Sequence, residues 1–159
     1  MVSLEKKTTY TCLNSHYPLI NLPTLERTPI AVIFKLEKTH NITEDQMIDF
    51  LFTSALFGRV VANNASVAGA TGGCQAEVGS ASAMAAAAAV SIFNGSPEQS
   101  GHAMALAISN LLGLVCDPVA GLVEIPCVMR NAIGSGNALI SADLALAGVE
   151  SQIPVDEVI

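Results

Sequence analysis

The middle of this chain is built almost entirely from small side chains, and this feature restricts its possible folds more than any other. Residues 81–93 contain five consecutive alanines, and alanine, glycine and serine recur on both sides of them. Alanine favours helices, and the segment lacks the alternation of a half-buried strand. Small side chains also let helix backbones approach one another closely. We therefore expect an all-α domain of tightly packed helices around a crowded centre.

Residues that cap or break helices indicate where each helix starts and stops. Thr43 and Gln46 fit a capping box, and Ser96 followed by Pro97 fits an N-cap with proline at the first helical position. Stretches rich in glycine and proline predict loops between the helices. The expected loops span residues 63–74 and 116–127, and the expected helices span residues 43–64, 75–93, 96–114 and 128–147, with a further helix start at Pro154.

Residues 1–34 differ from the rest of the chain. They mix threonine, asparagine and proline with scattered apolar residues, and no helical period persists in them. We expect an irregular, divergent segment here, followed by one helical domain over residues 35–159. The first ten residues are polar and charged, unlike a signal peptide, and no apolar run is long enough to span a membrane. Together with the cysteine content, this favours a cytoplasmic protein with reduced thiols.

Charged side chains are scarce and unevenly distributed. They make up 13% of the chain, about half the usual share, which indicates extensive buried surface and an oligomer. After Asn41 the only lysine or arginine residues are Arg59, interpreted as a solvated surface charge, and Arg130. A nucleic-acid partner needs clustered basic residues, so this class is excluded. The absence of a core lysine argues against a pyridoxal-phosphate enzyme, which needs one for its Schiff base.

Three cysteines lie at predicted junctions between loops and helices: Cys74, Cys116 and Cys127. A thiolate at a helix N-terminus is stabilised by the helix dipole, which suits Cys74 and Cys127. The three lie 42 and 11 residues apart, unlike the CxxC pairs of zinc fingers or ferredoxins. They could therefore share a metal only by converging in the tertiary structure. The alternative is that they are small buried core residues.

A set of three thiolate ligands, rather than four, has a chemical consequence. A cube-shaped iron–sulfur cluster held by three thiolates leaves one iron without a protein ligand, and that iron can bind substrate as a Lewis acid. Cys12, in the irregular N-terminal segment, is the remaining candidate for a fourth ligand. We expect Cys74, Cys116 and Cys127 to hold such a cluster and Cys12 to lie outside it.

Longer strings around these cysteines resemble a known family. From Lys35 to Ile159 the chain resembles the alpha subunit, or catalytic domain, of the iron–sulfur-dependent bacterial L-serine dehydratases. The strings that carry the resemblance are NNAS (63–66), GGCQAEVGS (72–80), GLVCDPVAG (113–121), PC (126–127) and RNAIG (130–134). The resemblance implies a four-iron four-sulfur cluster on Cys74, Cys116 and Cys127. It also implies elimination of water from L-serine to give pyruvate and ammonia, with a beta subunit or beta domain as partner.

The chain also departs from the pattern of that family. The family's alpha region is longer at both ends, with a Pro-Thr-Ala-Gly-Ser-like segment upstream, which residues 1–34 do not reproduce, and a cysteine-bearing tail downstream. We therefore expect a partial family member whose activity depends on a partner and on further segments. The alternative is a non-catalytic helical remnant that retains no cluster.

The elimination needs a base for the Cα proton, and the sequence offers several candidates. His102 is the only histidine in the predicted core helices, Glu77 follows Cys74 by about one turn, and Glu124 precedes Cys127 by three residues. Each has a plain structural alternative. His102 could be a packed or exposed bystander, and either glutamate could accept a hydrogen bond from a backbone N–H.

Arg130 is the best candidate for binding a substrate carboxylate, because a guanidinium can form two parallel hydrogen bonds with one. An ion pair with Asp117 or Glu124 is an equal alternative. Asn64 and Ser66, in the glycine-rich loop, could orient substrate, and ordinary capping of the loop is the competing interpretation.

Overall fold

The computed structural model describes residues 24–117 and 124–159. Its elements are α1 (Thr24–His40), α2 (Glu44–Asn64), α3 (Gly69–Cys74), the π-helix η3 (Gln75–Gly79), α4 (Ser80–Ile92), α5 (Pro97–Ser109), α6 (Glu124–Leu146) and α7 (Val155–Val158). Within these ranges no β-strand is present, so the predicted all-α fold is confirmed. None of the helices described is both long enough and apolar enough to cross a membrane.

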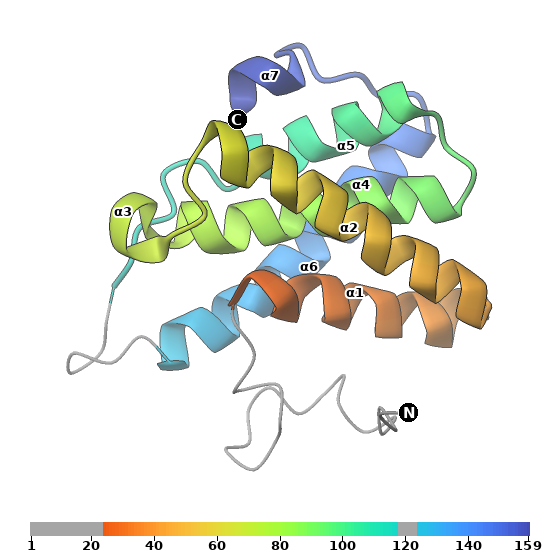
Figure 1. The fold of residues 1–159 in the computed structure, drawn as a ribbon, viewed down its shortest axis with the longest axis horizontal. Coiled ribbons are helices and arrows are strands. Elements are labelled where there is room, and N and C mark those ends of the chain that lie inside the picture. Colours follow the sequence, from red (N-terminus) through yellow and green to blue (C-terminus); the bar gives the residue numbers. More distant parts are fainter. Residues whose placement is uncertain (1–23, 118–123) are drawn as a thin grey trace.

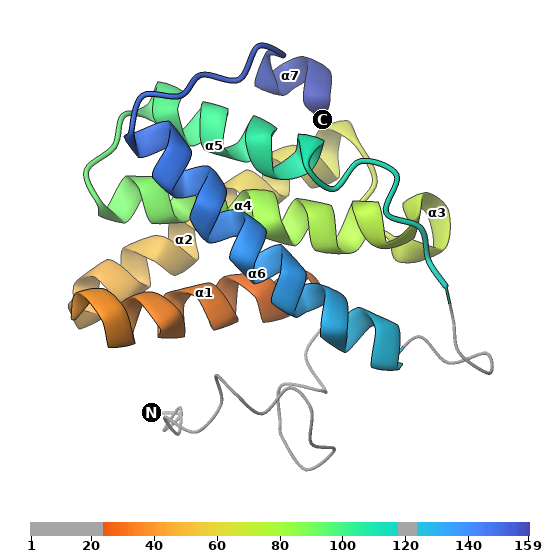
Figure 2. The ribbon, with the colours of Figure 1, turned by 180° about the vertical axis from the view of Figure 1, so that it is seen from behind.

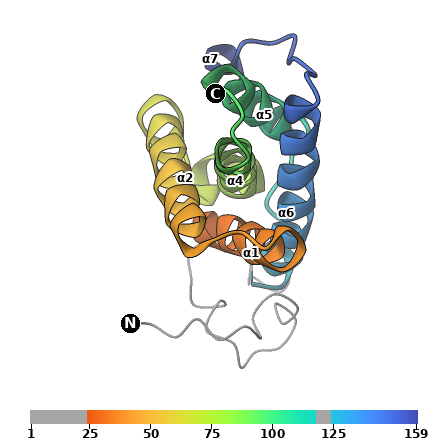
Figure 3. The same ribbon diagram turned by 90° about the vertical axis from the view of Figure 1, so that its right-hand side faces the viewer.

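Helix α4 runs through the centre of the molecule, and the other long helices surround it. Seen along its axis, α4 is enclosed by α1, α2, α5 and α6 (Figure 3), and it packs against all of them. Helix α2 lies on one side of α4 (Figure 1) and α6 on the opposite side (Figure 2). Every side chain from Ala81 to Val90 is buried. A helix enclosed on all faces must be apolar all round, and alanine meets this demand while keeping the neighbouring helices close.

Two of the predicted helix starts form as expected. The Thr43 hydroxyl accepts the Gln46 N–H at 3.2 Å, and the Gln46 side chain accepts the Thr43 N–H at 3.0 Å. The same reciprocal pair joins Ser96 and Gln99 at 3.2 and 2.9 Å, with Pro97 at the first position of α5. Each box satisfies two of the N–H groups near a helix N-terminus that lack intrahelical partners.

The prediction that residues 1–34 are irregular is wrong for their last part, because α1 begins at Thr24. The predicted domain boundary at Lys35 therefore falls inside a helix. Pro29 lies within α1 and removes one backbone donor, which weakens the local helical signal. Packing overrides this weakness, since several apolar side chains of α1 enter the main core, namely Val32, Ile33 and Leu36.

Other helix boundaries differ from the predictions close to the cysteines. Helix α5 ends at Ser109 rather than Leu114, and a turn follows it. Helix α6 already begins at Glu124, so Cys127 lies inside the helix, near its start. Residues 69–74, predicted as part of a loop, form the short helix α3. Proline near the start of α6 is tolerated because the first N–H groups of a helix have no intrahelical partner.

Replacing Ser96 by alanine tests the capping box of α5. The Gln99 N–H would lose its side-chain acceptor, and we expect the free energy of unfolding to fall by about 1 kcal/mol, measured by urea denaturation followed by circular dichroism. Ser91→Ala is the matched control, because Ser91 is an exposed serine on α4 whose hydroxyl makes no hydrogen bond with the described residues. An equal loss in both variants would contradict the capping role.

Candidate functional site

Cys74, Cys116 and Cys127 converge near α3. Cys74 ends α3 and Cys127 lies on α6, and both are buried, whereas Cys116 is exposed in the stretch that follows α5. Cys74 and Cys127 belong to one buried cluster, and the Cys74 thiol is close enough to Cys116 and Cys127 to raise the pKa of both. The tertiary convergence that a shared site requires is therefore present. Burial of Cys74 and Cys127 also fits ordinary core residues, but exposure of Cys116 does not.

Burial and the proximity of Cys74 oppose the ionisation of Cys116 and Cys127. Burial, with contributions from Cys74 and the Glu77 carboxylate, raises the pKa of Cys127 to about 11. Desolvation, followed by the same two neighbours, raises the pKa of Cys116, although its side chain is exposed. A metal binds the thiolate rather than the thiol, so a cationic partner at this position would offset the repulsion among the sulfurs.

The candidate donor set consists of three cysteine thiols from separate segments. No group of three or more His, Cys, Asp or Glu side chains in residues 24–117 and 124–159 is arranged to hold one metal ion. A cluster makes a different demand, because each thiolate binds a separate iron and the ligands need not surround one point. Three neighbouring soft thiolate donors fit iron–sulfur chemistry. The residues present are therefore compatible with the group that the sequence predicts.

Residues 113–117, which we call the Cys116 segment, are bound to the start of the π-helix. The Gln75 N–H donates to the Leu114 carbonyl oxygen at 2.8 Å, and the Gly113 N–H donates to Gln75 Oε1 at 2.6 Å. Gly73 adopts φ 69° and ψ −167°, a region almost restricted to glycine. Its backbone lies so close to this segment that a Cβ would stand 3.3 Å from both Leu114 O and Cys116 N.

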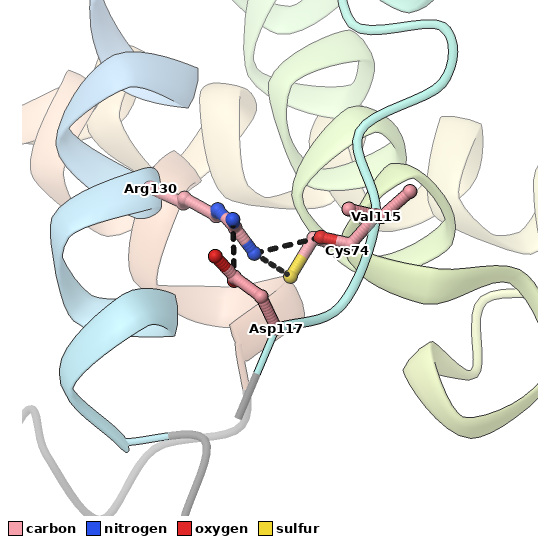
Figure 4. A network of polar contacts seen from close by, with 4 residues as sticks. All are labelled: Cys74, Val115, Asp117 and Arg130. Carbon is pink, nitrogen blue, oxygen red and sulfur yellow. Dashed lines mark hydrogen bonds and ion pairs between the residues drawn. The ribbon is translucent and has the colours of Figure 1, made fainter. Parts of the chain in front are cut away.

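Arg130 joins the Cys116 segment to α6 and to Cys74 (Figure 4). Its Nη1 donates to the Val115 carbonyl oxygen at 2.7 Å and to Cys74 Sγ at 3.1 Å, and its Nη2 forms an ion pair with Asp117 at 2.5 Å. The hydrogen bond to the Cys74 sulfur raises the pKa of Arg130 further above its usual range. Of the sequence-based alternatives, the ion pair with Asp117 is confirmed.

Glu77 lies within η3 and is the acidic candidate that the structure brings to the thiols. Its negative charge contributes to the raised pKa values of Cys116 and Cys127. Glu77 Oε1 accepts the Gly69 N–H at 3.1 Å, at the start of α3, so the predicted alternative of a backbone hydrogen bond is also present. π-helical turns occur often at functional sites, because the extra residue reorients side chains.

His102 lies elsewhere. Its Nδ1 accepts the Ser151 N–H at 3.2 Å, near the N-terminal end of α5, whereas the Cys116 segment follows the C-terminal end of the same helix. The structure therefore does not bring His102 to the thiols, and its catalytic role stays a prediction. The side chain of Glu124 and the whole of Cys12 lie outside the described residues.

Asn64 and Ser66 cap their loop. Asn64 Nδ2 donates to the Val60 carbonyl oxygen at 2.8 Å, and Ser66 Oγ accepts the Ala68 N–H at 3.2 Å. Ser66 also lines a cavity of about 210 Å³ together with Gln75. Arg59 is exposed, as expected for a surface charge.

Two supporting residues have no counterpart in the sequence-based predictions. Gln75 anchors the Cys116 segment, and Asn131 donates to the Cys127 carbonyl oxygen at 2.6 Å while accepting the Thr28 hydroxyl at 2.9 Å. Asn131 follows Cys127 by four residues, and this helical spacing could have indicated the first contact. The bond to Thr28 depends on how α1 packs against α6 and has no local signal.

Comparison with known sequences places the chain in a family. A family described as "Serine dehydratase alpha chain" matches residues 28–159. The chain belongs to this family. The resemblance predicted from the strings around the cysteines is therefore confirmed, and the match begins at residue 28 rather than residue 35.

Curated relatives carry the same description. "Probable L-serine dehydratase, alpha chain" of Bacillus subtilis (strain 168) is 65% identical over 81% of this chain, and the protein of that name from Latilactobacillus sakei is 64% identical over 81%. "L-serine dehydratase, alpha chain" of Peptoniphilus asaccharolyticus is 54% identical over 82%. The matched region spans 43%, 62% and 44% of these three relatives, respectively.

The pKa of Cys127 predicts a specific loss of stability at high pH. Because the folded thiol holds its proton up to about pH 11, against 9.0 ordinarily, its contribution is complete below pH 9 and is lost as pH rises through 11. We expect the unfolding free energy of the chelated, reduced protein to fall by up to about 2 kcal/mol relative to Cys127→Ser over this interval. Urea denaturation at a series of pH values measures it, and a constant difference would contradict the shift.

Replacing Gly73 by alanine tests the close approach of the Cys116 segment. The backbone angles of Gly73 disfavour any Cβ, and the added methyl would press on Leu114 and Cys116, so we expect a loss of about 2 kcal/mol of unfolding free energy. Gly136→Ala is the matched control, because a Cβ there meets nothing within 4 Å on α6. That control should be neutral or stabilising. Equal effects in thermal or urea unfolding would exclude the proposed packing.

Proposed function

We propose that this chain provides the cluster-binding part of an L-serine ammonia-lyase, which eliminates water from L-serine to give pyruvate and ammonia. The observation that carries the proposal is the convergence of Cys74, Cys116 and Cys127 in a member of the serine dehydratase alpha chain family. The reaction removes the hydroxyl from Cβ and a proton from Cα. The aminoacrylate released then tautomerises and hydrolyses to pyruvate and ammonia without further help from the protein.

In this proposal Cys74, Cys116 and Cys127 hold a four-iron four-sulfur cluster, and pyridoxal phosphate takes no part. When bound, such a cluster supplies a Lewis-acid iron with no protein ligand, which makes a hydroxyl a better leaving group. The role of the protein chain is to position the three cysteine ligands. Cys74 and Cys127 lie buried on helices, and exposed Cys116 forms the open edge of the site.

Glu77 is the residue to which we assign removal of the Cα proton. It lies close enough to Cys116 and Cys127 for its charge to affect both thiols. The bond from the Gly69 N–H fixes Oε1, and Oε2 accepts no hydrogen bond from the described residues, so it is free to take a proton. His102, whose Nδ1 is engaged by Ser151, is the alternative base and is less well placed.

Whole-enzyme activity in this proposal requires a beta chain or beta domain, within an oligomer in the cytoplasm. Large apolar side chains on the two stretches that carry Cys116 and Arg130 are more than half exposed: Leu112 at 56%, Val115 at 65%, Met129 at 53% and Ile133 at 60%. Such exposed apolar groups are typical of surfaces that another chain covers. A partner seated here would also exclude water from the substrate, which strengthens the electrostatic interactions of the site.

Anaerobic reconstitution of the full chain with iron and sulfide tests the proposal. We expect a brown protein with broad visible absorbance that forms pyruvate from L-serine once a beta chain is supplied. Cys74→Ser, Cys116→Ser and Cys127→Ser should each abolish cluster retention, because each removes one of the thiolate ligands. Cys12→Ser is the matched control and should retain the cluster.

The assignment of the base has its own test in the reconstituted enzyme. Glu77→Gln keeps an acceptor for the Gly69 N–H but removes the base, so kcat should fall by about a hundredfold or more at unchanged cluster content. His102→Gln should stay within a few-fold of the wild type. A large fall of kcat in His102→Gln and a small one in Glu77→Gln would identify His102 as the base instead. A colourless chain that never forms pyruvate would instead support the non-catalytic remnant.

A further inference from the structure

Arg130 holds the residue on each side of Cys116 and the sulfur of Cys74 with a single guanidinium. Val115 and Asp117 are the immediate neighbours of Cys116, and both bind Arg130 (Figure 4). The remaining contact of Nη1 is with Cys74 Sγ. A planar guanidinium keeps its donors at set separations and angles. The geometry of Arg130 therefore determines how the Cys116 segment lies relative to Cys74.

We infer that Arg130 is a positioning residue that latches the Cys116 segment against Cys74, rather than the group that binds the substrate carboxylate. The inference rests on the proposed function, since it concerns the thiols proposed as cluster ligands. Both hydrogens of Nη1 and one of Nη2 bind protein partners, so the donors left over are those on the Nε side of the guanidinium. A carboxylate bound across Nη1 and Nη2 would have to displace Asp117 or Val115 and so release the segment.

The Cys116 segment has two anchors of different strength. At its start, Gly113 and Leu114 are held by Gln75 through two hydrogen bonds to one residue of η3. At its other end, in the described residues up to Asp117, the polar contacts that reach α6 come from Arg130. Cys116 is exposed, so burial does not hold it in place. Loss of Arg130 therefore releases Cys116, whereas Gly113 and Leu114, at the start of the segment, stay bound to Gln75.

The three contacts of Arg130 are unequal. The Asp117 side chain is 61% exposed, so its ion pair with Arg130 is partly screened by water and is weaker than a buried one. The bond to Cys74 is different, because Arg130 is only 15% exposed and Cys74 is buried. Lysine keeps the charge but presents a single nitrogen, which cannot serve Val115, Asp117 and Cys74 together. Arg130→Lys should therefore open the latch more than Asp117→Asn does.

Alkylation of each cysteine in the metal-free, reduced full chain tests this latch independently of any cluster. After short pulses of iodoacetamide, mass spectrometry of peptides gives a rate for every thiol. We expect Arg130→Lys, which keeps a positive charge near the thiol, to speed alkylation of Cys74 by roughly tenfold, because release of the Cys116 segment opens access to this buried sulfur. Arg130→Gln should speed it less, because alkylation proceeds through the thiolate, which a neighbouring cation stabilises. Cys127 should change by less than about twofold, because the contacts of Arg130 with the described residues reach Val115, Asp117 and Cys74 but not Cys127. Asp117→Asn should give an intermediate rate.

Arg59→Lys is the matched control, since Arg59 is an exposed arginine on α2, and it should leave all rates unchanged. Equal acceleration of Cys74 and Cys127 in the Arg130 variants would indicate general loosening and overturn the latch. An unchanged Cys74 rate would overturn it too. Should Arg130→Lys not fold, as judged by circular dichroism, Asp117→Asn still decides, because a Cys74 rate equal to that of Arg59→Lys contradicts the latch.

Iron retained after reconstitution and desalting adds a second readout. The latch predicts that Arg130→Lys loses iron at least several-fold faster than the wild type. A substrate-binding role predicts the opposite pattern, with full iron retention and a raised KM, and that result would overturn the inference. A wild-type chain that holds no iron would contradict the proposed function. The alkylation rates of the metal-free chain would still show whether Arg130 holds the Cys116 segment against Cys74.

Discussion

Burial of helix α4 on every side is the constraint on which the rest of the structure depends. A central helix must present no unpaired polar group, and its side chains must be narrow enough for four neighbours to reach it. Alanine meets both conditions. Helix α6 pairs the buried Ser82 hydroxyl of α4, which donates to the Gly134 carbonyl oxygen at 2.9 Å and accepts from Asn137 at 2.8 Å. Gly134 marks how close α6 comes, because a Cβ there would lie 2.8 Å from Val78.

The same packing places the site. Helix α6 lies against η3 and α4 at Gly134, and Cys127 precedes this contact by about two helical turns, which brings it beside Cys74. Helix α5 ends close to Gln75, so the segment that follows it can be tied to η3. Two thiols are thus held by apolar burial on helices, while Cys116 is held by hydrogen bonds and an ion pair. Polar contacts of this kind are weaker and more easily exchanged than core packing, which makes Cys116 the adjustable member of the set.

The sequence alone predicted a structural feature correctly where both interacting residues lie in the same short segment of the chain. The boxes at Thr43 and Ser96 and the long alanine run fall in this class, because their partners lie within one helical turn. Helix α1 is the contrary case. Pro29 weakens its local pattern, and its stability comes from side chains that meet α4, an element separated from it by the whole of α2. Local sequence could not reveal that contact, since packing between distant segments overrides propensity.

The choice between the candidate bases likewise depends on tertiary structure. Sequence offered His102 and Glu77 as comparable residues, because proximity to Cys74 along the chain says little about a histidine on another helix. Only the packing of α5 shows that His102 meets Ser151, away from the thiols, and that Glu77 is close enough to affect them.

By itself, the sequence determined the all-α class, several helix starts, the family and the three cysteines, because composition, capping and contiguous strings are local properties. Tertiary structure alone decided that these cysteines lie near one another, that Arg130 joins Cys74 to the two neighbours of Cys116, and that Asp117 forms an ion pair with its guanidinium. The physical reason is that residues 42 and 11 positions apart approach one another only after helices pack around α4, and no local pattern encodes that packing.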